Sequence, residues 1–192
     1  MNVTGWVIDT FGEIVKRSSS PTLEELMLDV REDEDLVLNE PSSMTARWNG
    51  AAWIDRPTSP GEHAQWDRAL AVWVDPRTLD KAKTDRIFTM KTARDAAVFG
   101  GMLWDGSGFD TDERSQSVLL GLYVDSQAPA FEPQPWRLSD NSWRVLDAAA
   151  AAGVWAALRA HVKLQFTKFA TREYAIQQAT TPAAVDAVSW EI

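Results

Sequence analysis

A chain of 192 residues with 45% hydrophobic and 24% charged residues has the composition of an ordered protein with one or two small domains. It contains no cysteine, which excludes disulfides and thiolate metal sites and agrees with synthesis in a reducing cytoplasm. No apolar run approaches the ~20 residues of a membrane span, and the N-terminal residues lack the pattern of a secretion signal, so we expect neither membrane insertion nor secretion.

The formal net charge of −9 is concentrated at the N-terminal end. Residues 1–40 contain ten acidic and three basic residues, a balance of −7, and Glu32–Asp35 are four consecutive acids. Such a charge repels phosphate backbones, so we expect no nucleic-acid partner. The acidic run is predicted to be a solvated turn, and the alternative is a docking patch for a basic partner.

The first predicted element is a β-hairpin. Val3–Ile8 has the composition of a strand, Asp9–Gly12 that of a turn, and Glu13–Lys16 that of the returning strand. The strand pattern breaks at Ser18–Pro21, where we expect the hairpin to have ended.

A short helix and a third strand are predicted to follow. Thr22 and Glu25 have the spacing of a capping box, in which the hydroxyl and the carboxylate bind exposed backbone donors, so we expect a helix over Leu23–Val30. A further strand is expected over Leu36–Leu38. Together these elements predict a compact α+β module over residues 1–57.

The middle of the chain repeats one pattern, in which two aromatic residues stand on either side of a tight turn. The three segments are Trp48-Asn49-Gly50 with Trp53-Ile54-Asp55, Trp66-Asp67 with Trp73-Val74-Asp75, and Trp104-Asp105-Gly106 with Phe109-Asp110. Asn-Gly is the strongest short hairpin signal because both residues tolerate positive φ. Cross-strand aromatic pairs contribute about 0.2–1 kcal/mol each. Because an isolated hairpin is marginal, each ribbon is expected to pack on a helix or on another chain.

A long helix is predicted next, with Asp75 as its N-cap, Pro76 at its first position and Gly100-Gly101 at its end. Its apolar face contains Leu79, Ala82, Ile87, Met90, Ala93 and Ala97, and its basic residues are Lys81, Lys83, Arg86, Lys91 and Arg94. We expect an ordinary packing helix with solvated lysines, and the alternative is docking on an acidic partner surface.

Two smaller elements are predicted before the C-terminal helix. Asp110 or Thr111 is expected to cap a helix that runs through Tyr123 and is followed by a proline-rich loop. Trp136–Leu138 and Trp143–Leu146 flank a turn of Ser and Asx residues, which predicts another hairpin.

The longest predicted element is a helix over Ala148–Ala179, capped by Asp147 and followed by Thr181-Pro182, which would span about 45–50 Å. A narrow apolar stripe along it contains Trp155, Leu158, Val162, Phe166, Phe169 and Ile176. Such a stripe suits one partner helix, so we expect packing against the helix around 77–98, with self-association as the alternative. Trp190 is predicted either to anchor another subunit or to dock on its own domain.

These elements predict the fold class α+β. A small acidic α+β module over residues 1–57 is expected to be followed by a hairpin and linker over 58–76. A helical domain over 77–192, with inserted hairpins and the long C-terminal helix, completes the predicted organisation.

The sequence carries no motif that predicts catalysis or a cofactor. It has no phosphate-binding loop, nucleophile elbow or His-Glu-x-x-His motif. His63 and His161 lack motif partners, and His161 is expected to be a hydrogen-bonded structural residue. Asp105, Asp110 and Asp112 do not follow the calcium-loop spacing and are expected to serve turns and helix caps. We therefore expect no enzyme, no metal and no cofactor.

A set of residues in the second half of the chain carries a family resemblance. It consists of Lys91, Arg94-Asp95-Ala96-Ala97, Gly100-Gly101, Trp104-Asp105-Gly106, Phe109-Asp110, Asp112, Ser115-Gln116, Trp136, Asp140-Asn141, Trp143 and Ala160-His161-Val162. These residues resemble an uncharacterised domain family of tailed bacteriophages, whose members occur in tail-fibre proteins or beside fibre genes. The ribbons at Trp48 and Trp66 are similar to the aromatic hairpins of tail-fibre assembly proteins. The resemblance covers residues 88–180 well and 1–87 loosely.

The resemblance implies a location and a partner, and no catalytic residues. We expect a structural protein of the phage tail associated with the tail fibre, made in the host cytoplasm and located in the virion. Its expected partners are tail-fibre or baseplate proteins, in a homo- or hetero-oligomer. The alternatives are a fibre-assembly chaperone and a carbohydrate- or receptor-binding module at the fibre tip. The candidate partner-binding residues are Trp48, Trp53, Trp66, Trp73, Trp155, Leu158, Val162, Phe166, Phe169 and Trp190.

Overall fold

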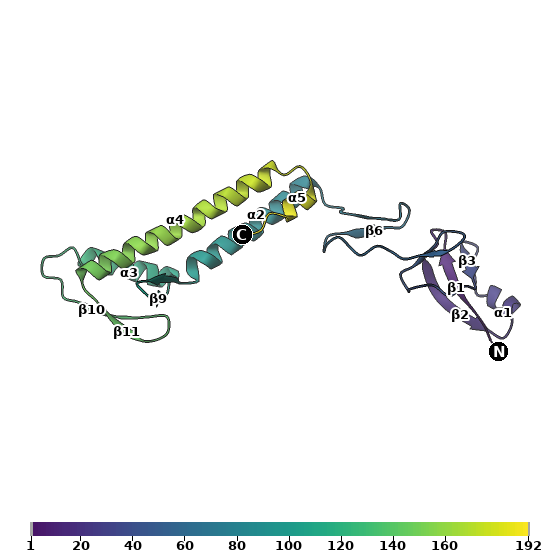
Figure 1. Ribbon diagram of the computed structural model, residues 1–192, viewed down its shortest axis with the longest axis horizontal. Coiled ribbons are helices and arrows are strands. Elements are labelled where there is room, and N and C mark those ends of the chain that lie inside the picture. Colours follow the sequence, from purple (N-terminus) through teal and green to yellow (C-terminus); the bar gives the residue numbers. More distant parts are fainter. Residues whose placement is uncertain (1, 192) are drawn as a thin grey trace. The chain divides into compact units, whose positions relative to one another are not determined.

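The computed structural model describes residues 2–191 and forms two compact units, one extending to Pro76 and the other beginning at Arg77 (Figure 1). The first unit contains strands, ribbons and one short helix, and the second contains the long helices with two inserted hairpins. This arrangement confirms the predicted α+β fold class, including the long C-terminal helix.

The first unit is built on an antiparallel sheet of order β2-β1-β3. Its strands are β1 (Val3–Asp9), β2 (Ile14–Ser20) and β3 (Glu34–Val37). Trp6 and Val7 of β1 are both buried, so both faces of the central strand are covered, since successive side chains point to opposite faces. The break predicted at Ser18 is wrong. β2 continues through this residue, because it pairs with β1 as far as Ser20, which lies opposite Val3.

The acidic run lies partly in the sheet. β3 begins at Glu34, two residues before the predicted start, so Glu34 and Asp35 pair with Asp9 and Ile8 of β1. The predicted solvated turn is therefore confined to the preceding residues. Backbone pairing accounts for the difference, because a strand can use acidic residues whose side chains reach solvent.

Thr22 is the N-cap of the short helix α1 (Leu23–Met27), as predicted, and its hydroxyl accepts the backbone N–H of Glu25 (3.2 Å). Within residues 2–191 the Glu25 carboxylate makes no return bond, so only half of the predicted capping box is formed. The helix ends before the predicted Val30, because the backbone N–H groups of Asp29 and Val30 bond three residues back and tighten the chain into turns.

Three two-stranded ribbons carry the repeated aromatic pattern. They are β4 (Arg47–Trp48) with β5 (Trp53–Ile54), β6 (Gln65–Asp67) with β7 (Val72–Val74), and β8 (Met102–Trp104) with β9 (Ser107–Phe109). The first two ribbons belong to the first unit and the third belongs to the second unit.

The second unit is organised around two long antiparallel helices, α2 (Leu79–Phe99) and α4 (Ala148–Gln178), which lie side by side (Figure 1). Near the end of α2 the Ala97 carbonyl lies 2.9 Å from His161 Nε2, and near its start Lys83 Nζ donates to the Gln177 carbonyl (2.7 Å). The predicted intramolecular packing of these helices and the structural role of His161 are confirmed.

The start of α2 differs from the prediction. Thr78 is the N-cap, and its hydroxyl accepts the backbone N–H of Lys81 (3.2 Å). Asp75 and Pro76 therefore precede the helix, because the threonine three residues later provides the capping oxygen.

The start of α3 (Glu113–Asp125) also differs, since Asp112 is its N-cap and accepts the backbone N–H groups of the second and third helical residues. Thr111 is instead fully buried. Its hydroxyl donates to the Val98 carbonyl (2.6 Å) and accepts the Gly101 N–H (2.9 Å), which joins the end of α2 to the start of α3.

The remaining elements are the predicted hairpin of β10 (Gln134–Arg137) with β11 (Trp143–Leu146) and the short helix α5 (Pro182–Asp186). The predicted cap of α4 is confirmed, because Asp147 accepts the Ala150 N–H (2.8 Å).

The second unit contains two hydrophobic clusters. One lies between α3, α4 and the hairpins, with Met102, Phe109, Leu119, Leu122, Leu138, Leu146, Ala151, Val154 and Leu158. The other joins α2, the end of α4 and α5, with Ala82, Met90, Phe169, Ile176 and Val185. A part of the α4 stripe adjoins the first cluster, to which Leu158 belongs, and that part lines the site described below.

Candidate partner-binding site

Each of the three ribbons holds the cross-strand aromatic pair that its sequence predicts. The ring centroids lie 5.4 Å apart in Trp48 and Trp53, 5.4 Å apart in Trp66 and Trp73, and 5.9 Å apart in Trp104 and Phe109. All three pairs are edge-to-face, the geometry in which the positive edge of one ring meets the negative face of the other.

The first ribbon packs on the turn between β1 and β2. The backbone N–H of Trp48 donates to the Gly12 carbonyl (2.8 Å), and Arg47 Nε donates to the Phe11 carbonyl (2.6 Å). The indole N–H of Trp53 donates to the Asn39 carbonyl (2.9 Å). The first ribbon is therefore fixed by its own unit.

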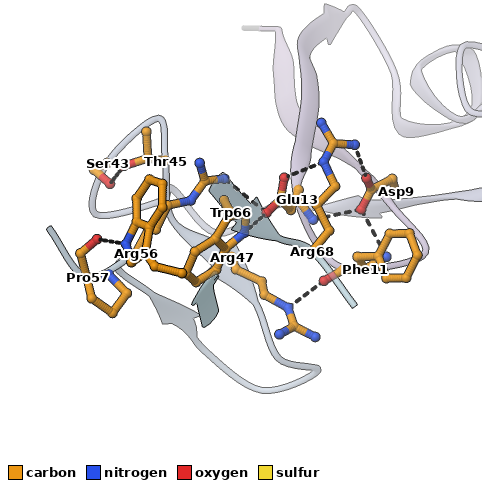
Figure 2. A network of polar contacts seen from close by, with 11 residues as sticks. Asp9, Phe11, Glu13, Ser43, Thr45, Arg47, Arg56, Pro57, Trp66 and Arg68 are labelled. Carbon is orange, nitrogen blue, oxygen red and sulfur yellow. Dashed lines mark hydrogen bonds and ion pairs between the residues drawn. The ribbon is translucent and has the colours of Figure 1, made fainter. Parts of the chain in front are cut away.

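The second ribbon is anchored by a buried carboxylate, that of Glu13 (Figure 2). Glu13 accepts the indole N–H of Trp66, and it forms ion pairs with Arg56 (2.9 Å) and Arg68 (3.0 Å). Arg68 also reaches Asp9 (3.2 Å), and the Arg56 guanidinium lies 4.7 Å from the Trp66 ring centroid. A buried carboxylate requires such partners, because removing a charge from water without them is costly.

The indole N–H groups of three ribbon tryptophans are hydrogen-bonded within the first unit. The indole N–H of Trp73 donates to the Pro57 carbonyl (2.7 Å), in addition to the donors of Trp53 and Trp66. A partner therefore finds none of these three indole donors free. The physical role that the structure assigns to Trp48, Trp53, Trp66 and Trp73 is the packing of their own ribbons.

The third ribbon packs on α4. A Cβ atom added to Gly153 would lie 2.7 Å from the Trp104 ring, so the glycine allows the indole to approach the helix closely. Arg144 lies over the same ring, 4.8 Å from its centroid, and pairs with Asp105 (2.5 Å). The helix that a marginal ribbon needs is thus provided by the chain itself.

The apolar stripe of α4 opens into a groove beside α3. Its volume is about 470 Å³, and it is lined by Gln116, Trp155, Leu158, Arg159, Val162, Lys163 and Phe166. The groove contains four of the ten candidate partner-binding residues, Trp155, Leu158, Val162 and Phe166. They come together because intervals of three and four residues place side chains on one face of a helix.

The groove has a buried floor and an exposed end. Leu158 is only 1% exposed and belongs to the adjoining core, whereas Phe166 is 48% exposed. Trp155 stacks on Tyr123 of α3 with ring centroids 5.9 Å apart, and Arg94 of α2 lies 4.6 Å from the Phe166 ring centroid. Neighbouring helices therefore hold the aromatic side chains in place without covering them.

A family model described as "Domain of unknown function (DUF4376)" matches residues 81–189, which is more than half of the chain. The chain belongs to the DUF4376 family. Neither the curated proteins nor the solved structures include a match to it. The groove lies entirely within the DUF4376 domain, whereas the two ribbons of the first unit lie outside it.

The rim of the groove carries two exposed cations, Arg159 and Lys163, one helical turn apart on α4 of the DUF4376 domain. Within residues 2–191 neither has an acidic partner. Arg159 and Lys163 therefore place a local positive charge beside the apolar floor of the groove.

The other two candidate residues lie elsewhere in the DUF4376 domain. Phe169 is buried in the cluster of α2, α4 and α5, and Trp190 packs against the same cluster. Lys168 Nζ lies 4.6 Å from the Trp190 ring centroid. The structure therefore places Trp190 on its own domain, the second of the two expected positions.

Of the acidic residues considered for chemistry, Asp112 caps α3 and Asp105 lies in the turn of the third ribbon. The Ser115 hydroxyl, the Ser115 N–H and the Arg114 N–H donate to Asp112 and lower the pKa of its carboxyl. The Ser142 hydroxyl lowers the pKa of Asp140 in the same way. Within residues 2–191 no group of three or more His, Cys, Asp or Glu side chains is placed to hold a metal ion. No helix in that range has the length and apolarity needed to span a membrane.

Sequence reasoning missed the charged residues of these sites, namely Arg159 and Lys163 at the groove and Glu13 with its arginine partners at the second ribbon. Arg159 and Lys163 could have been found, because their spacing from Trp155 is that of neighbours on one helix face. Glu13 carried no such signal, because its partners Arg56 and Arg68 lie far along the chain and meet it only after the ribbon has packed.

Proposed function

We propose that this protein is a structural protein of a bacteriophage tail, located in the virion, that binds the tail fibre through the groove on α4 and has no catalytic role. The observation that carries the proposal is the groove, in which apolar side chains that contact neighbouring helices remain accessible beside the buried Leu158. The placement in the tail is supported by the residues over 88–180 that resemble the tail-fibre family.

The composition of the groove supports binding to a protein partner. Trp155 and Phe166 are aromatic side chains already fixed by their neighbours, so their burial by a partner would release water at little cost in side-chain entropy. Residues of this kind, clustered over a buried floor such as Leu158, are typical centres of binding energy in protein interfaces.

The contacts of the first-unit ribbons favour a supporting role for that unit. Their tryptophans are paired and their indole donors are bound within the chain, so we propose that they maintain the unit and contribute contact area only through exposed edges. The carbohydrate-binding alternative, in which these rings stack on sugars, is therefore not favoured.

The proposal is tested by asking whether the protein accompanies the fibre into the particle. Mass spectrometry of purified virions should find the polypeptide at a fixed ratio to the fibre protein, and coexpression of the two chains should yield a complex on size-exclusion chromatography with light scattering. Absence from the particles together with failure to bind the fibre would refute the proposal.

An assembly chaperone is the second candidate, because the same open groove could bind the fibre chain transiently. The two functions give different results in the same experiments. A chaperone would bind the fibre on coexpression and be missing from mature particles, whereas a structural protein would be present in both.

A further inference from the structure

We infer that the groove on α4 binds an amphipathic helix of the fibre chain whose apolar face is flanked by acidic residues. This inference rests on the proposed function and adds the chemistry of the segment that the groove recognises. Three features of the groove support it, namely its length, its helical lining and the charge on its rim.

The length of the groove matches a short helix. Trp155 and Phe166, its outermost apolar residues along α4, are eleven positions apart, which corresponds to about 16 Å or three helical turns. A partner helix of the same length presents apolar residues at intervals of three and four, which is the pattern that recognition of a helix in a groove requires.

The lining of the groove favours a helix over an extended strand. All its residues come from α3 and α4, so no strand edge is available there to pair with an added backbone. In an apolar groove an extended segment would lose backbone hydrogen bonds to water without replacing them, whereas a helix satisfies its own. Side chains of a third helix can instead pack between the ridges of α4.

The charge on the rim selects acidic flanks. Arg159 and Lys163 are exposed, lie beside the apolar floor and have no acidic partner within residues 2–191. A basic or neutral helix over the apolar floor would leave both cations without an opposite charge. A helix with carboxylates one turn apart would pair with both cations. Two cations are far fewer than the contacts by which proteins usually follow a phosphate backbone, so the apolar helix is the better match.

Photocrosslinking identifies what occupies the groove. Phe166 is replaced by p-benzoylphenylalanine, which keeps an aromatic ring at the exposed end of the groove, and the protein is coexpressed with the fibre chain. Tyr174 is the matched control, since it is an exposed aromatic residue on the same helix that does not line the groove. Peptide mapping should place the crosslink from position 166 on an acidic amphipathic segment of the fibre, and position 174 should give no crosslink there.

Charge reversal tests the role of the rim. Lys163→Glu should weaken binding of the fibre about tenfold, which corresponds to about 1.4 kcal/mol. Changing acidic residues in the crosslinked fibre segment to lysine should restore binding. Lys91→Glu is the control, because Lys91 is an exposed lysine on α2 outside the groove, and this variant should bind within about twofold of the original protein. Circular dichroism establishes that each variant is folded.

The outcomes separate this inference from the proposed function. If Lys163→Glu binds as well as Lys91→Glu, the inference is wrong and the proposed function stands. If the fibre binds but is not crosslinked from position 166, both the inference and the groove as the binding site are wrong, and only the association with the fibre stands. A crosslink from position 166 to a second copy of this chain also overturns the inference. If the fibre does not bind under any condition, both are overturned.

Discussion

Gly12→Ala should destabilise the first unit, because the backbone of Gly12 lies directly against the first ribbon. Its φ is +79°, and a Cβ atom at this position would lie 2.0 Å from the Trp48 carbonyl oxygen. The Gly12 carbonyl also accepts the Trp48 N–H (2.8 Å). Gly12→Ala therefore imposes a left-handed conformation on an L-residue and pushes the ribbon away from its hydrogen bond.

The destabilisation caused by Gly12→Ala can be compared with that caused by Gly50→Ala. Gly50 has a φ of +96°, and a Cβ atom there would have no neighbour within 4 Å, so Gly50→Ala introduces the backbone strain alone. That strain is about 1–2 kcal/mol. The gain from a stiffer unfolded chain, about 0.4–1 kcal/mol, applies to both variants and cancels in the comparison. Gly12→Ala adds a steric overlap with backbone and loses a hydrogen bond worth about 1 kcal/mol. We expect it to destabilise the first unit by about 2 kcal/mol more than Gly50→Ala does.

Hydrogen exchange measured by mass spectrometry is the suitable assay, because peptides from each unit report their opening free energies separately. Gly12→Ala should lower protection in the β4–β5 ribbon and at the turn between β1 and β2, while peptides of α4 keep their protection. Equal losses in Gly12→Ala and Gly50→Ala would show that the close approach of Trp48 to Gly12 does not contribute to stability.

Three further predictions follow from buried contacts, a helix cap and the groove. Glu13→Ala removes the carboxylate that pairs with Arg56, so the first unit should lose about 3 kcal/mol of stability in urea unfolding, and no loss would indicate that the network is dispensable. The lowered pKa of Asp112 means that the folded protein favours the charged carboxylate. The stability that this carboxylate contributes is present above the unfolded pKa of about 3.9 and is lost as the pH falls through the lower folded pKa. Asp112→Asn should therefore make the thermal stability of the second unit less dependent on pH between about 5 and 3. Leu158→Ala should lower the free energy of unfolding by about 2–5 kcal/mol because Leu158 is buried. Phe166→Ala should lower it by less than about 1 kcal/mol and should instead weaken binding of the fibre. Similar unfolding midpoints for the two variants would contradict this difference.

Local chemistry made several elements predictable from the sequence. The aromatic pairs that cross each ribbon turn are in place, and Asp147 caps α4, because turns and caps are decided by residues within a few positions of one another. The errors at the start of α2 and α3 arose where several capping residues compete. There Thr78 and Asp112 prevailed over earlier candidates.

The spacing of apolar residues predicts an apolar stripe on α4, but it does not show which part of the stripe other elements cover. That coverage follows from the packing of the folded chain. α2 and α5 bury Phe169 and Ile176, and the adjoining core buries Leu158, while Phe166 remains accessible at the end of the groove. The same packing makes Glu13 the anchor of a ribbon whose Trp66 lies far along the chain. Periodicity assigns residues to a face of an element, whereas exposure depends on neighbours that only the folded chain brings together.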